Sequence, residues 1–104
     1  MMAIQHAKDS NFAERVQSEG ITVVNFWASW CGPCRMFAPV LEEFEKEAGA
    51  AVSVVKVNVD ESPVTSSQYQ IMSIPATIIF KDGIPQHSEV GILPMKMLQQ
   101  LSRG

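Results

Sequence analysis

Cysteine and histidine are scarce in this chain, which has two of each among its 104 residues. Both cysteines lie in one short stretch, WCGPC, from Trp30 to Cys34, whereas His6 and His87 are distant from it in the sequence. A structural zinc site needs about four such ligands at regular spacing. The scarcity therefore disfavours a zinc site, and no metal is expected, so the cysteine pair must serve another purpose.

Basic residues and long apolar runs are also few. Eight Lys and Arg residues stand against eleven Asp and Glu, for a net charge of −3. This balance offers neither a basic face for a phosphate backbone nor a polybasic patch for a membrane, so we expect no nucleic-acid or lipid partner. The N-terminus, MMAIQHAKDS, lacks the apolar core of a secretory signal, and no run approaches the roughly 18 apolar residues of a membrane span.

These absences predict a cytoplasmic protein. Reducing conditions in the cytoplasm keep most thiols reduced, so a lone cysteine pair is more often catalytic or metal-binding than a structural disulfide. Hydrophobic residues make up 46% of the chain and charged residues 18%, as in an ordinary folded protein. A chain of this length fits one domain, covering residues 1–104, and we expect it to be a monomer.

Strand and helix patterns alternate along the chain. Strands are predicted at residues 3–6, 21–28, 51–60, 76–83 and 87–90, the fourth ending in a turn at Asp82 and Gly83. Helices are predicted from a cap at Asp9 or Ser10 to Gly20, at residues 34–48, at residues 64–69 after an N-cap at Ser62, and at residues 94–101. Because helices interleave with strands, the pattern predicts an α/β fold: a mixed, mostly parallel sheet with an antiparallel edge hairpin, covered by helices on both faces.

The cysteines are predicted to lie where a strand gives way to a helix. The unsatisfied N–H groups and positive dipole at a helix start favour an anion, and hence a cysteine thiolate. The spacing of three lets the two sulfurs meet across one turn. Cys31, the more exposed candidate, would then attack a foreign disulfide, and Cys34 would resolve the mixed disulfide.

A structural role and an inert role both account less well for the cysteine pair. A structural disulfide that closes so small a loop would remove little chain entropy. Two inert core thiols would need neither the Gly32-Pro33 dipeptide between them nor a helix start after them. Thiol chemistry is therefore the favoured interpretation.

The sequence resembles the thioredoxin family over essentially its whole length. The resemblance is carried by NFWASWCGPCRMFAPVLEE, KVNVDESP, SIPATIIFKDG and the VG at Val90 and Gly91, in that order. It implies a thioredoxin fold and a protein-disulfide reductase, with Cys31 attacking, Cys34 resolving and a cis peptide bond at Ile74-Pro75. It also implies no bound cofactor beyond the redox-active disulfide, disulfide-containing proteins as clients, and recharging by an NADPH-dependent flavoprotein, thioredoxin reductase.

The resemblance further implies a shallow apolar rim around the cysteines that receives an extended client segment. Its residues would be Trp30, Gly32, Pro33, Met72, Ile74, Pro75, Gly91 and Ile92. The backbone of Ile74 would offer strand-like hydrogen bonds to the client. For Trp30 and Met72 the alternative is ordinary packing, and Phe26, Trp27 and Phe80 are expected in the core.

One position departs from the family pattern. The family has an aspartate in the strand before the motif, where this chain has Asn25 in VNFWA. The family's buried carboxylate exchanges a proton with the resolving cysteine, and an amide cannot titrate. Lys56, the expected neighbour of residue 25, is retained, although a lysine there can also be an ordinary surface side chain.

Two further functions stay open beside the reductase. A thioredoxin-like domain can serve as a binding or scaffold module with weak redox activity, and Asn25 leaves room for that alternative. A dedicated oxidant or isomerase is the third, but the Gly-Pro dipeptide and the lack of a signal sequence favour the reductant.

Overall fold

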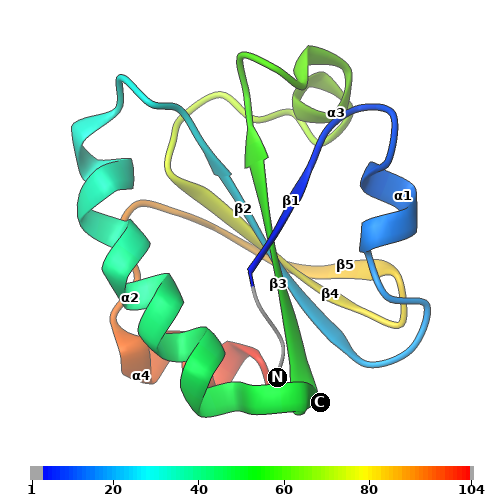
Figure 1. The fold of residues 1–104 in the computed structure, drawn as a ribbon, viewed down its shortest axis with the longest axis vertical. Coiled ribbons are helices and arrows are strands. Elements are labelled where there is room, and N and C mark those ends of the chain that lie inside the picture. The colour runs from blue at the N-terminus through cyan, green and yellow to red at the C-terminus, as the bar shows by residue number, and fades with distance from the viewer. Residues whose placement is uncertain (1–3, 104) are drawn as a thin grey trace.

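A five-stranded sheet with helices on both faces organises the chain (Figure 1). The computed structural model describes residues 4–103. The strands are β1 Gln5–Ala7, β2 Ile21–Trp27, β3 Val52–Asn58, β4 Ala76–Lys81 and β5 Ile84–Val90. The helices are α1 Phe12–Arg15, α2 Gly32–Ala48, α3 Pro63–Gln68 and α4 Met95–Leu101, with a short 3-10 turn at Gly49–Ala51. This is the predicted element order, except that the predicted start of the first strand, Ala3, lies outside the described residues.

The sheet is mixed, as predicted. Its strand order is β1-β3-β2-β4-β5, with β1, β3 and β2 parallel to one another and β4 and β5 antiparallel to their neighbours. Every residue of β2 is buried except Trp27, which is half-buried. The continuously apolar pattern of this segment therefore marks the central strand, which carries the chain directly to the cysteines.

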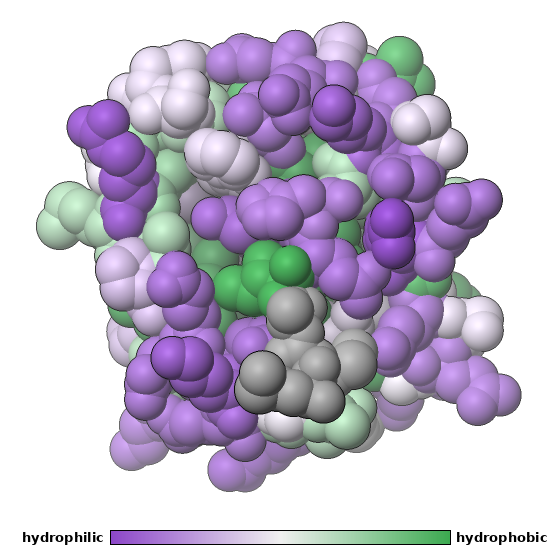
Figure 2. All heavy atoms as spheres, viewed as in Figure 1, coloured by the Kyte–Doolittle hydropathy of each residue, from purple (hydrophilic) through white to green (hydrophobic). Residues whose placement is uncertain are grey.

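The sheet separates two hydrophobic cores. In Figure 1, α2 and α4 lie on one side of the sheet, and α1 and α3 lie on the other. On the first side Phe37, Leu41 and Phe44 of α2 pack against alternate residues of β2 and β3. On the other side Phe26 and Phe80, which are 0% and 1% exposed, pack with Phe12 of α1, so both are core residues as predicted. Hydrophilic side chains cover most of the face seen in Figure 2.

The first helix is shorter than predicted, and its predicted cap is wrong. Instead of running from Asp9 or Ser10 to Gly20, α1 ends at Arg15, and Val16 is already extended. The next backbone N–H, that of Gln17, donates to the hydroxyl of Thr22 at 3.1 Å rather than to a helical carbonyl. A side chain from the following strand thus replaces the bond that would continue the helix.

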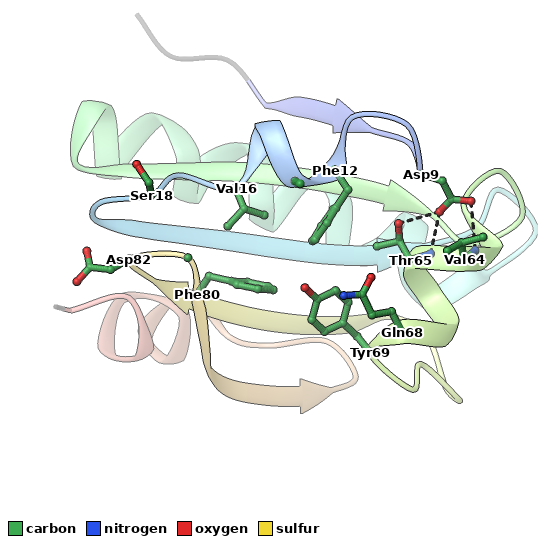
Figure 3. Close-up of a pocket in the computed structure, with 12 residues that line it drawn as sticks. Asp9, Phe12, Val16, Ser18, Val64, Thr65, Gln68, Tyr69, Phe80 and Asp82 are labelled. Atoms are coloured by element: carbon green, nitrogen blue, oxygen red, sulfur yellow. Dashed lines mark hydrogen bonds between the residues drawn. The ribbon is translucent and has the colours of Figure 1, made fainter.

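Asp9 instead caps α3. Its carboxylate accepts hydrogen bonds from the backbone N–H of Val64 at 3.2 Å, and from the N–H and hydroxyl of Thr65 at 2.8 and 2.7 Å (Figure 3). The predicted N-cap, Ser62, makes no such side-chain bond. The free N–H groups of the α3 start are therefore satisfied by a residue from the β1–α1 loop.

We expect this cap to make stability depend on pH. The Thr65 N–H, with further help from the Thr65 hydroxyl and the Val64 N–H, holds the pKa of Asp9 below its usual value. A carboxylate with a depressed folded pKa stabilises the protein above its unfolded pKa of about 3.9 and loses that contribution as pH falls through the folded value. Asp9→Asn should therefore lower the free energy of unfolding at pH 7, and the deficit should shrink in acid. Urea titrations at pH 7 and pH 3 measure it.

A matched control is available in the same region. Glu61→Gln removes an exposed acidic residue of the β3–α3 loop and should show no such pH-dependent deficit. A deficit of Asp9→Asn that stayed constant between pH 7 and pH 3 would contradict the electrostatic account of the cap.

Candidate dithiol site

The two cysteines lie at the start of α2, as predicted. Cys31 is the N-cap residue and Cys34 lies in the first turn. The two form a disulfide, with Cα atoms 5.3 Å apart. The backbone N–H of Cys34 donates to Cys31 Sγ at 3.2 Å. A hydrogen bond to a charged acceptor is stronger than one to a neutral acceptor, so an N–H in this position stabilises a thiolate at Cys31. Together with the helix dipole, this N–H favours an anionic sulfur at Cys31.

The exposed fraction does not distinguish the two cysteines. The sequence predicts that Cys31 is the more exposed, but Cys31 and Cys34 are 5% and 4% exposed in the disulfide form. Both pack against Ala28, with Val59 and Ile74 alongside. The distinction between them is instead the hydrogen bond, which the Cys34 N–H makes to Cys31 Sγ.

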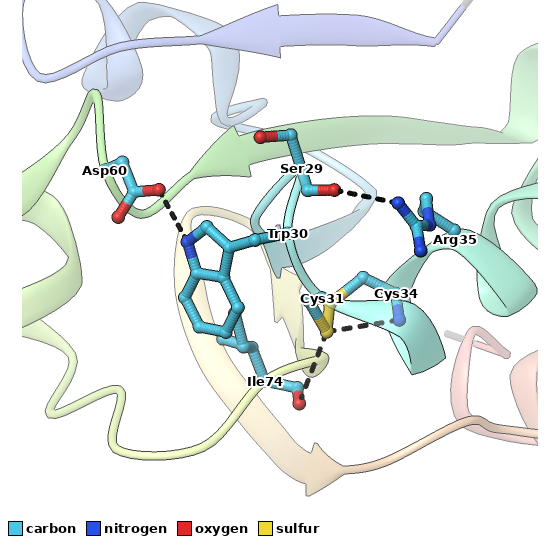
Figure 4. Close-up of a disulfide and its surroundings, with 7 residues drawn as sticks. All are labelled: Ser29, Trp30, Cys31, Cys34, Arg35, Asp60 and Ile74. Carbon is cyan, nitrogen blue, oxygen red and sulfur yellow. Dashed lines mark hydrogen bonds between the residues drawn. A yellow bond between two sulfur atoms is a disulfide. The ribbon is translucent and has the colours of Figure 1, made fainter.

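The Ile74-Pro75 loop closes over the sulfurs. Its peptide bond is cis, in agreement with the resemblance. The carbonyl oxygen of Ile74 lies 3.8 Å from Cys31 Sγ (Figure 4), and the carbonyl oxygen of Pro75 accepts a 2.8 Å hydrogen bond from the N–H of Gly91. The Ile74-Pro75 loop therefore joins the disulfide on one side to the segment at Gly91 on the other.

Trp30 is held beside the disulfide by a residue that sequence reasoning missed. Its ring is 67% exposed, and its Nε1–H donates to the carboxylate of Asp60 at 2.8 Å (Figure 4). Asp60 lies in the KVNVDESP stretch, but nothing in its local pattern points to a residue thirty positions away. On the other side of the motif, Arg35 donates to the carbonyl oxygen of Ser29 at 3.4 Å.

The other expected rim residues range from exposed to buried. Met72 and Ile92 are 93% and 43% exposed, which excludes ordinary packing for Met72. Ile74 is half-buried and Pro75 is buried. The remaining rim positions, Gly32, Pro33 and Gly91, are half-buried, exposed and half-buried. Gly91 has a φ of +102°, a conformation that favours glycine.

Asn25 and Lys56 are neighbours on adjacent strands. Asn25 is 2% exposed and pairs in register with Lys56 on β3 and Thr77 on β4. The amide nitrogen of Asn25 and the hydroxyl of Thr77 are buried without a hydrogen-bond partner. Register partners share one face of a sheet, so Asn25 and Thr77 lie on the same face. This is the face covered by α2, because Val23 and Ile79, two residues away on the same strands, pack against α2.

Lys56 is half-buried rather than an ordinary surface lysine. Its Nζ lies 4.8 Å from the centre of the Trp27 ring, and Trp27 packs against the cysteine cluster. Burial lowers the pKa of Lys56, and the negative charge of Glu42 opposes that shift. Trp27 itself is half-buried, and its Nε1 is buried without a partner, so it is less fully a core residue than predicted.

A separate pocket of about 410 Å³ lies on the opposite side of the sheet. It is lined by α1, α3 and the β4–β5 turn, including Asp9, Phe12, Tyr69 and Phe80 (Figure 3), and neither cysteine contributes to it. Among residues 4–103 there is no group of three His, Cys, Asp or Glu side chains that could hold a metal ion. In the same residues no helix is long and apolar enough to span a bilayer.

Comparison with known proteins identifies close relatives. A family model described as Thioredoxin matches residues 3–103. The chain is 47% identical over 100 residues to a thioredoxin of Staphylococcus haemolyticus, covering 96% of this chain and 95% of the relative. It is 46% identical over 100 residues to a thioredoxin of Bacillus subtilis, with the same coverage. A thioredoxin of Alicyclobacillus acidocaldarius is 50% identical over 91 residues, which are 88% of this chain and 87% of that one.

Proposed function

This chain belongs to the thioredoxin family and is a thiol-disulfide oxidoreductase that reduces protein disulfides through Cys31 and Cys34, and on that premise we propose how its residues divide the reaction. The reduced form begins with a Cys31 thiolate. The observation that carries this assignment is the N–H of Cys34 aimed at Cys31 Sγ at the start of α2.

In the first step Cys31 Sγ attacks one sulfur of a client disulfide. The client S–S bond breaks, a mixed disulfide forms between Cys31 and the client, and the other client sulfur leaves as a thiolate. In the second step the deprotonated Cys34 attacks Cys31 Sγ. The Cys31–Cys34 disulfide forms, and the client leaves with both of its sulfurs reduced.

The rim positions the client for the first step. We assign client contact to Trp30, Gly32, Pro33, Met72, Ile74, Pro75, Gly91 and Ile92. Ile74 supports this assignment because its carbonyl lies 3.8 Å from Cys31 Sγ, so a client strand that pairs with this backbone would bring its disulfide to the nucleophile. Asp60 acts as a positioning residue, because it holds the exposed ring of Trp30.

Asn25 and Lys56 set the electrostatics behind the sulfurs. Without a carboxylate at position 25, residue 25 carries no negative charge that would repel a thiolate or add to the charge of Glu42 near Lys56, so both thiols should ionise more readily. The same substitution leaves no titrating group at position 25 to take the proton of Cys34, so resolution must use water as the acceptor or a Cys34 thiolate that forms spontaneously. Exchange therefore proceeds, with a slower second step near neutral pH.

The oxidised chain needs an external reductant. We propose that an NADPH-dependent flavoprotein, thioredoxin reductase, returns the Cys31–Cys34 disulfide to the dithiol, that the chain acts as a monomeric single domain in the cytoplasm, and that it carries no cofactor other than its own disulfide. The relatives from Staphylococcus haemolyticus and Bacillus subtilis support this, since both are named thioredoxins and match nearly the whole chain.

A coupled assay tests this proposal. NADPH, a bacterial thioredoxin reductase and insulin are mixed with the chain, and NADPH oxidation is followed at 340 nm. The chain should drive oxidation at a rate proportional to its concentration, and Cys31→Ser should leave only the background rate. In a second assay dithiothreitol replaces NADPH and the reductase. If the chain catalyses insulin reduction by dithiothreitol but drives no NADPH oxidation in the coupled assay, the reductase is rejected as its partner. If the chain supports neither NADPH oxidation nor insulin reduction, and Cys31→Ser still captures a partner, the binding module is favoured. The non-titrating Asn25 is the observation that supports this second candidate.

A further inference from the structure

Met72 is the most exposed large hydrophobic residue that the structure describes. Its side chain is 93% exposed, compared with 69% for Met36 and 36% for Met97. It lies two residues before Ile74, whose carbonyl oxygen is 3.8 Å from Cys31 Sγ. Since two residues of extended chain span at most about 7 Å, the Met72 backbone lies within that distance of Ile74, on the loop that contacts the nucleophile.

The apolar side chain of Met72 is almost entirely exposed to solvent, so it is available for contact with a partner. Little of its surface touches the rest of the chain, so Met72 contributes little to the fold. A long, unbranched thioether adapts to surfaces of different shape, which suits a contact with many clients. The same exposure leaves its sulfur open to oxidants, whereas the two cysteine sulfurs belong to residues that are 5% and 4% exposed.

We propose that Met72 is an oxidation-sensitive recognition site: hydrogen peroxide converts it to methionine sulfoxide, and the oxidised side chain weakens client docking while leaving the chemistry of the cysteine pair intact. This inference rests on the proposed rim. The thioether sulfur donates an electron pair to one peroxide oxygen, the O–O bond breaks, the S–O bond forms, and the second oxygen leaves as water. The sulfur is oxidised by two electrons, and the peroxide is reduced.

The physical consequence follows from polarity. The sulfoxide is a strong hydrogen-bond acceptor, and burying it against an apolar client surface without a donor costs free energy that the thioether does not. A client that relies on the rim should be affected, and a small disulfide that needs little of the rim should not. The expected loss in kcat/KM is about five- to tenfold for a protein client, and less than twofold for 5,5′-dithiobis(2-nitrobenzoate).

The test treats the disulfide form with hydrogen peroxide, so that the cysteine sulfurs are protected, and then removes the peroxide. Peptide mass spectrometry records which methionines carry oxygen. Reduction of insulin is then measured with dithiothreitol as the electron source, and reduction of 5,5′-dithiobis(2-nitrobenzoate) is measured with pre-reduced protein after the dithiothreitol has been removed, because free dithiothreitol reduces this reagent directly. Each protein is compared with its own untreated sample, so an altered starting activity of a variant does not matter.

Two variants separate Met72 from the other methionines. Treated Met72→Leu retains every other oxidisable methionine and should show a treated-to-untreated ratio near one with insulin. Treated Met36→Leu retains Met72 and should lose activity as the parent does. Untreated Met72→Gln, which has a polar side chain of similar length, should show the same loss of activity toward insulin as the treated parent. Methionine sulfoxide reductases should restore the activity of the treated parent.

Three outcomes would overturn this inference, and a fourth would reject the proposed function. Equal loss in treated Met72→Leu and in the parent, or no loss in a parent shown to carry the Met72 sulfoxide, would overturn this inference. Equal loss toward insulin and the small disulfide would overturn it as well, because damage would then lie at the cysteines. Failure of the untreated parent to reduce either substrate would instead reject the proposed function.

Discussion

Cys34→Ser is expected to stop the reaction after its first step, with the client joined covalently to Cys31. Cys31 keeps its place at the start of α2 and the N–H of residue 34 beside its sulfur, so attack on a client disulfide is retained. The mixed disulfide then has no internal thiol to resolve it. Release depends on thiols from solution, whereas an oriented intramolecular group has an effective concentration of roughly 10⁵–10⁸ M. Multiple turnover with millimolar dithiothreitol should fall more than about a thousandfold.

Non-reducing electrophoresis and intact mass measure this arrest directly. Cys34→Ser mixed with a disulfide client should give a one-to-one adduct that dithiothreitol removes. The matched variant Cys31→Ser should give no adduct. An adduct on Cys31→Ser but none on Cys34→Ser would reverse the roles assigned to the two cysteines.

Asn25→Asp is expected to change the pH dependence of turnover. Asn25 is 2% exposed and its amide nitrogen lacks a partner, so the substitution places a carboxyl group of nearly the same shape at a buried site beside Lys56. If that carboxylate takes the proton of Cys34, kcat near neutral pH should rise by up to about 10²-fold, the lower end of general-base contributions. Its negative charge should also raise the pKa of both thiols, so attack on clients should slow at low pH.

The measurement is insulin reduction from pH 5 to pH 9 under conditions that saturate the client. Asn25→Leu is the matched control, since it keeps the size of the side chain and cannot titrate, so it should not gain rate. An unchanged rate and pH profile in Asn25→Asp would show that position 25 takes no part in the proton transfer.

Features that depend on neighbouring residues were predictable from the sequence. The buried strand β2, the amphipathic α2 and the Asp82-Gly83 turn follow from local patterns, and both turn residues have the positive φ that such a hairpin turn uses. The cysteines at the helix start were predictable for the same reason. The short α1 was not, because a hydroxyl from Thr22 ends it, and that contact exists only after β2 has folded beside it.

The features that the sequence did not predict depend on contacts between residues far apart in the chain. The cap of α3 comes from Asp9, 56 residues before Thr65, and the exposed ring of Trp30 is held by Asp60. No local pattern encodes such pairs. The approach of Ile74 to Cys31 was likewise reached only through the family resemblance, because nothing in residues 31 or 74 alone brings them together.

The central claim is that the start of α2 stabilises a thiolate at Cys31, and the alkylation rate of the reduced protein tests it most directly. Iodoacetamide is added in a pH series, and mass spectrometry assigns the label to Cys31. The account predicts a midpoint for Cys31 clearly below the value of about 8.5 for a free cysteine, with faster labelling than a cysteine peptide at pH 7. A midpoint at or above about 8.5 and a peptide-like rate at pH 7 would contradict it.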